Sequence, residues 1–198
     1  MQQKSRLTRI IACYATFSIL QSLFSHIEFF NVNKQHHYEY LVNLSISIFI
    51  IVEITCFYWL LRLGHTTIPQ RRAMRLLLLG YYLFAAIYLS LMFLKNKVND
   101  VESFVELPIL IVYCCIYYYN VFANKPQTNL ARQPLFWAMG GMALLAFMQI
   151  PYNIVYTYMN SQKSGLQVPL IINNISYCLL FGCFWQALRL TAKTPTHA

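Results

Sequence analysis

The stretch "YLVNLSISIFIIVEITCFYWLL" (Tyr40–Leu61) decides the fold class, because Glu53 is its only Asp, Glu, Lys or Arg residue. A helix that crosses a hydrocarbon core of about 30 Å needs about 20 mostly apolar residues. Backbone groups in lipid must be hydrogen bonded within the protein, so a spanning segment is a helix unless it closes a barrel. The alternation typical of strands is absent here. The stretch therefore predicts a membrane-spanning helix.

Five further stretches on either side show the same pattern. The chain has 58% hydrophobic and 11% charged residues. Soluble domains average about 45–50% apolar and about 25% charged residues, so this composition is typical of a protein in lipid. The short polar loops leave no room for a soluble domain. The sequence predicts an all-α integral membrane bundle of about six transmembrane helices, forming one domain over residues 1–198. The predicted spans are Ile10–Phe30, Tyr40–Leu61, Arg75–Leu94, Phe104–Phe122, Leu135–Tyr158 and Val168–Leu190.

The distribution of basic residues predicts the orientation. Cytoplasmic loops of membrane proteins carry an excess of Lys and Arg. Most of the 15 Lys and Arg residues lie in the N-terminal segment, the second loop, the fourth loop and the C-terminal tail. Both termini are therefore predicted to be cytoplasmic, in a multi-pass protein of the cell's inner (plasma) membrane. Topology also accounts for the net charge of +9, so we expect the lipid bilayer as a partner and no direct nucleic-acid binding.

Polar residues recur within the predicted spans. In the first span, Ser18, Gln21, Ser22 and Ser25 follow helical spacing down one side. Polar side chains at membrane depth are expected to face the bundle interior. Either these side chains line an outward-facing polar pocket, in which Glu53 acts as a proton-sensing or gating group, or they form hydrogen-bonded contacts between helices. The predicted intramembrane polar or gating residues are Glu53, Gln21, Ser25, Glu106, Asn153, Asn173 and Asn174.

The second loop supplies an inner basic patch. Its Arg residues serve either to anchor the chain to anionic lipid or to dock an acidic partner or a nucleotide, and lipid anchoring is the simpler interpretation. The inner basic patch consists of Arg62, Arg71, Arg72 and Arg75.

Metal and thiol chemistry are weakly indicated. An outer group of His26, Glu28, His36 and His37 has residue types that bind borderline metals, but their spacing matches no metal motif, so solvated histidines are the favoured interpretation. We predict no metal and no other cofactor. All six cysteines lie within apolar segments, which predicts small buried side chains rather than an extracellular disulfide framework. Catalytic motifs such as GxSxG, HExxH and a P-loop are absent, so we predict that the chain is not an enzyme.

The last third, "PLFWAMGGMALLAFMQIPYNIVYTYMN" (Pro134–Asn160) followed by "LIINNISYCLLFGCFWQALRL" (Leu170–Leu190), carries an FWxxG opening, a Pro-broken fifth span and an Asn-containing last span. In these features it resembles small bacterial multi-span membrane proteins of the sensory-module type. That resemblance implies a sensor bundle without its output domain. Small multi-span accessory proteins of bacterial defence systems, such as RNA-targeting CRISPR loci, are similar in size and span count.

These observations favour a non-enzymatic integral membrane sensor or regulatory accessory protein, which acts through a protein partner or a homo-oligomer. The alternative is an oligomeric pore or membrane-perturbing effector, in which the polar side of the first span lines a conduit. A small transporter is a third option, disfavoured because neither an inverted repeat nor paired broken helices are found.

Overall fold

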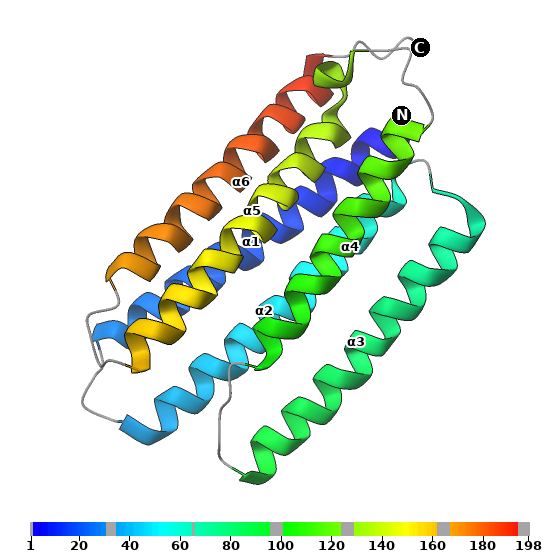
Figure 1. Cartoon of the computed structure of the whole chain (residues 1–198). Helices are drawn as coiled ribbons and strands as arrows, with labels where there is room; N and C mark the ends of the chain where they lie inside the picture. The colour runs from blue at the N-terminus through cyan, green and yellow to red at the C-terminus, as the bar shows by residue number, and fades with distance from the viewer. Residues whose placement is uncertain are drawn as a thin grey trace.

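The computed structural model describes residues 2–30, 35–64, 66–95, 101–123, 129–161 and 167–193. In these residues all regular secondary structure is helical, which confirms the predicted all-α class. Figure 1 shows long helices that run up and down along one bundle. The helices are α1 (Gln2–Phe30), α2 (Gln35–Arg62), α3 (Ile68–Lys95), α4 (Val101–Ala123), α5 (Pro134–Ser161) and α6 (Gln167–Lys193), with a 3-10 turn η1 (Leu130–Arg132) before α5.

Each predicted span lies within one of these helices. Five helices are long and apolar enough to cross a membrane, so the chain is a multi-pass membrane protein. The described part of α1 falls below that threshold, because it carries Arg6, Arg9 and Gln21 among its apolar residues. That α1 crosses the membrane, and that the termini are cytoplasmic, stay predictions. The five segments are Leu44–Arg62, Ile68–Leu91, Val105–Ala123, Pro134–Met159 and Val168–Lys193.

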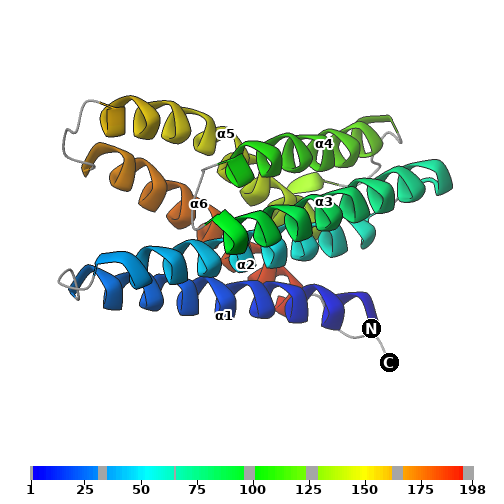
Figure 2. The ribbon, with the colours of Figure 1, turned by 90° about the horizontal axis from the view of Figure 1, so that it is seen from below.

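Helix α2 lies at the centre of the bundle. It contacts α1, α3, α4 and α5, whereas α5 and α6 form the most extensive helix pair. Helix α3 packs only against α2 and α4 among its main contacts, and it lies on the opposite edge of the bundle from α6 (Figure 1). Figure 2 shows α1 and α2 side by side along one side of the bundle. The outward face of α3 is apolar, with Leu76, Leu79, Leu83 and Ile87 exposed. This is the pattern expected where lipid, rather than water, covers the surface.

The core is rich in aromatic side chains. The fully buried Tyr14 of α1 has Phe57 of α2 at a ring-centroid distance of 5.4 Å and Phe184 of α6 at 5.6 Å. Phe49 and Phe181 complete its surroundings, at 5.9 Å and 6.3 Å. Because lipid tails are as apolar as these rings, close packing and hydrogen bonds, rather than removal from water, select this arrangement over separated helices.

The end of the bundle at which α2 ends and α3 begins is here called the basic end, since it carries the inner basic patch. Two amide side chains join α3 to α4 there. Gln70 Nε2 donates to Asn120 Oδ1 and Asn120 Nδ2 donates to Gln70 Oε1, both at 3.0 Å. The backbone N–H of Thr67 also donates to Gln70 Oε1, at 2.9 Å. These bonds fix the start of α3, and with it the arginines, against the end of α4.

Candidate functional site

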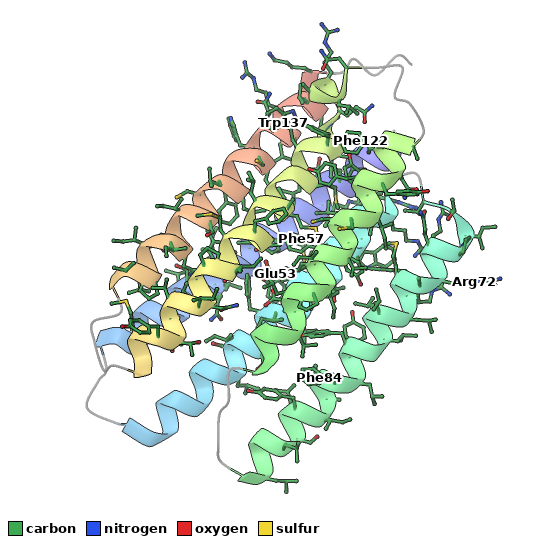
Figure 3. All side chains as sticks on the ribbon, in the orientation of Figure 1. Glu53, Phe57, Arg72, Phe84, Phe122 and Trp137 are labelled. Atoms are coloured by element: carbon green, nitrogen blue, oxygen red, sulfur yellow. The ribbon has the colours of Figure 1, made fainter. Side chains whose placement is uncertain are left out.

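The buried carboxyl of Glu53 is the centre of the candidate site. Glu53 lies at the middle of the apolar segment Leu44–Arg62 of α2, and its side chain is 3% exposed, among the aromatic residues of the core (Figure 3). Tyr14 of α1 donates its hydroxyl hydrogen to Glu53 Oε1 at 2.8 Å. An ionised carboxyl at this depth costs several kcal/mol unless it is paired or hydrogen bonded. Tyr14 supplies one such bond and joins α1 to α2.

A second carboxyl meets the first. Glu106 of α4, which is half-buried, lies close enough to Glu53 for the two side chains to interact. Two carboxyls that share a buried site do not readily ionise together, because like charges repel and burial disfavours charge. We therefore expect the pair to hold at least one proton, which gives it a charge of −1 or 0 and lets one carboxyl donate to the other.

Two further tyrosines complete the group. Tyr177 of α6 interacts electrostatically with both carboxyls and with Tyr152 of α5. The site thus takes side chains from five helices: α1, α2, α4, α5 and α6. We call these residues the carboxyl–tyrosine cluster: Tyr14, Glu53, Glu106, Tyr152 and Tyr177.

The cluster can bind and release a proton without losing every hydrogen bond. With two protons the pair is neutral, and with one proton it carries a single negative charge that Tyr14 stabilises as a donor. Hydrogen bonds to a charged acceptor are about twice as strong as those between neutral groups. A change of one proton therefore alters the strength of contacts that join α1, α2 and α4.

Only some of the predicted polar residues join this cluster. Gln21 is half-buried on α1 and has polar interactions of its own. Asn173 accepts a hydrogen bond from Gln149 Nε2 at 3.2 Å, which joins α5 to α6. Asn153 is half-buried, whereas Asn174 is exposed. The expectation that Asn174 faces the bundle interior is therefore wrong, because the adjacent Asn173 takes the inward position.

Two other predicted groups fall outside the described side chains. Those of Ser25, His26 and Glu28 are not described, and neither are those of His36 and His37. The suggested outer metal group thus stays untested. Within the described residues, no group of three or more His, Cys, Asp or Glu side chains is placed to hold a metal ion.

The inner basic patch divides between two helices. Arg62 ends α2, with its guanidinium 5.0 Å from the ring centroid of Trp59. Arg71 Nε donates to Thr66 Oγ1 at 3.0 Å, at the start of α3. Arg72 is exposed and points away from the bundle (Figure 3), and Arg75 is exposed one turn further along. The patch is therefore a charged surface rather than an enclosed site.

Sequence reasoning identified Glu53 and Glu106 but missed the three tyrosines. The chain contains 15 tyrosines, and Tyr is common both in cores and at membrane interfaces, so residue type alone does not select these three. One signal was present: Tyr14 lies on the same side of α1 as Ser18 and Gln21, four and seven residues further along.

Comparisons with known proteins add no relative. No protein-family model matches this chain, and no curated protein or solved structure is significantly similar to it. The resemblance to sensory-module membrane proteins therefore stays a prediction. The case for a function rests on the carboxyl–tyrosine cluster and the basic end.

Proposed function

We propose that this chain is a non-enzymatic sensor or regulatory protein of the bacterial inner membrane, which acts through a protein partner. The sensed event is the gain or loss of the second proton of the Glu53–Glu106 pair. The observation that supports the proposal is the buried Glu53 carboxyl, which accepts a hydrogen bond from Tyr14 at 2.8 Å and has the second carboxyl of Glu106 beside it.

The physical basis is the cost of charge in a poorly polarisable interior. A neutral carboxyl pair needs little stabilisation from its surroundings, whereas a singly charged pair needs hydrogen-bond donors to offset the cost of its buried charge. Tyr14 is such a donor at 2.8 Å, and Tyr177 lies close enough to interact with both carboxyls. Loss of the second proton therefore favours closer approach of α1 and α6 to the carboxyl pair. Gain of the proton removes this preference.

Helix α2 supplies a direct route to the basic end. Glu53 and Arg62 lie on the same continuous helix, separated by about 14 Å at 1.5 Å per residue. The adjoining start of α3 presents exposed Arg71, Arg72 and Arg75. A shift of α2 would move this charged surface, which suits an acidic partner or the headgroups of anionic lipid.

The test is amide hydrogen exchange of the full chain in lipid nanodiscs, measured by mass spectrometry at several pH values. The segment to follow is residues 66–72 at the basic end. Because the chemical exchange rate itself depends on pH, wild type is compared with Glu53→Gln at each pH. We expect protection of this segment to change with pH in wild type, and that change to shift or disappear in Glu53→Gln, where Glu106 is a single carboxyl beside an amide and no longer shares a proton.

Thr55→Val is the matched control. The Thr55 hydroxyl bonds with the Tyr82 hydroxyl of α3 at 2.7 Å, two residues from Glu53 but outside the cluster. This variant should keep the wild-type response to pH, as should any variant that merely loosens α2. An identical response in wild type and Glu53→Gln would contradict the proposal. Ion leakage through vesicles that contain the wild-type protein would instead support the pore alternative.

A further inference from the structure

Two cysteines meet beside the carboxyl–tyrosine cluster. Cys13 of α1 and Cys56 of α2 lie on either side of the contact between these two helices. Cys13 directly precedes Tyr14, and Cys56 follows Glu53 by three residues, or about one helical turn. The helix contact that brings the Tyr14 hydroxyl to Glu53 at 2.8 Å therefore also brings the two thiols close enough to interact.

Their exposure makes one thiol reachable and the other protected. Cys13 is exposed on the outside of the bundle, whereas Cys56 is buried. Cys56 belongs to the apolar segment Leu44–Arg62, so its partner Cys13 lies at the same depth. A reagent that reaches Cys13 at this depth arrives through the hydrocarbon region of the membrane rather than from water.

We propose that Cys13 and Cys56 form a reversible disulfide between α1 and α2, with a lipid-soluble quinone as the oxidant. A disulfide needs a Cβ separation of about 3.5–4.5 Å, and the close α1–α2 contact at Tyr14 and Glu53 places the two cysteines where a small shift can reach it. Both the dithiol and the disulfide are uncharged, so the reaction leaves no charge in lipid. This site is independent of the proposed sensor function, and it gives a role to two side chains whose residue type alone suggested only packing.

The reaction balances without any other component. The two S–H bonds break and one S–S bond forms between the sulfur atoms of Cys13 and Cys56. Two electrons and two protons pass to the quinone, which leaves as the quinol. Two molecules of a lipid-soluble thiol reverse the reaction: the first forms a mixed disulfide at the exposed Cys13 sulfur and frees Cys56, and the second frees Cys13 and leaves with the first as their own disulfide.

The other described cysteines lack this arrangement. Cys114 and Cys115 are adjacent on α4, one buried and the other exposed, so they point in different directions. Cys183 of α6 packs where α5 passes closest, since a Cβ added at Gly141 would lie 2.8 Å from its Cβ. Cys178 is exposed on α6, and it serves as the matched control for Cys13.

The experiment uses the full chain in lipid nanodiscs, treated with decylubiquinone. The ring of this quinone is fully substituted, so it oxidises thiols without adding to them. The protein is then denatured in N-ethylmaleimide, and its intact mass counts the free thiols. Wild type should lose two alkylated thiols relative to the untreated protein, and a proteolytic digest should contain the Cys13 and Cys56 peptides joined to each other.

The variants separate this pair from the remaining cysteines. Cys178→Ser should still lose two alkylated thiols, whereas Cys13→Ser should lose none. The digest of the wild-type protein identifies directly which two cysteines are joined. The result therefore does not depend on how well Cys13→Ser folds. Full alkylation of quinone-treated wild type, or a disulfide that joins any other two cysteines, would overturn the proposal.

Discussion

Replacing Tyr14 by Phe removes one hydroxyl group and leaves the packing of the ring in place. Tyr14 is 1% exposed, and the rings of Phe57 and Phe184 pack against its own ring. Phe at this position would keep these ring contacts. The hydroxyl donates to Glu53 Oε1 at 2.8 Å. The free energy of unfolding of Tyr14→Phe should therefore report the value of this single hydrogen bond.

The expected magnitude depends on the charge of the carboxyl pair. A hydrogen bond between neutral groups contributes about 0.5–1.5 kcal/mol, and one to a charged group about 1.5–3 kcal/mol. Interhelical hydrogen bonds in a membrane protein average about 0.6 kcal/mol. We expect a loss of about 1 kcal/mol at acidic pH, where the pair holds two protons. We expect a loss of about 2 kcal/mol at alkaline pH, where it holds one.

The assay is reversible unfolding of the full chain in bicelles, by titration with SDS at the two pH values, followed by circular dichroism. Tyr119→Phe is the matched control, because Tyr119 lies on α4 and is 68% exposed. It should change the free energy of unfolding by less than about 0.5 kcal/mol. Equal losses for Tyr14→Phe at the two pH values would refute the proposed change in charge. Equal losses for both variants would refute the importance of the bond.

Two further predictions concern helix contacts away from the cluster. Gly141→Ala should destabilise the protein by about 1–3 kcal/mol relative to Gly182→Ala. The Cβ added at Gly141 would lie 2.8 Å from Cys183 Cβ, whereas nothing lies within 4 Å of a Cβ added at Gly182. Equal midpoints of SDS unfolding for the two variants would contradict this. Gln70→Ala should cost about 1–3 kcal/mol by taking partners from the buried Asn120 amide. Replacing both amides by Leu should recover most of that loss in the same assay, and simply additive losses would contradict this.

The number and positions of the helices could be predicted from hydropathy, because a run of about 20 apolar residues is rare in chains that do not cross a membrane. The helix ends could not. Helix α2 begins at Gln35 and α3 begins at Ile68, several residues before the predicted spans at Tyr40 and Arg75. An apolar window marks the part of a helix in lipid, while the backbone hydrogen bonds continue into the polar flanks.

Which side of each helix faces inward was harder to predict, because the outside is apolar as well. In a soluble bundle the polar face marks the surface, but in lipid both faces are apolar and only packing separates them. Asn173 and Asn174 illustrate this, since adjacent asparagines in one helix take the inward and outward positions. Glu53 and Glu106 could be identified as costly in lipid, but their contact with each other depends on how α2 packs against α4.

The bundle itself supplies an argument that the carboxyl pair has a role beyond holding helices together. Where α3 and α4 are joined at the basic end, Gln70 and Asn120 do so with two reciprocal amide hydrogen bonds and no ionisable group. An amide pair would serve equally at the centre of the bundle, with neither a required proton nor a charge to stabilise. Glu53 and Glu106 instead bring two ionisable carboxyls together, which is favourable only when at least one of them carries a proton. If adhesion were their only role, Glu53→Gln should preserve both the stability of the bundle and its response to pH. If the pair senses protons, the same variant should keep the stability and change the response, because Glu106 is then a single carboxyl.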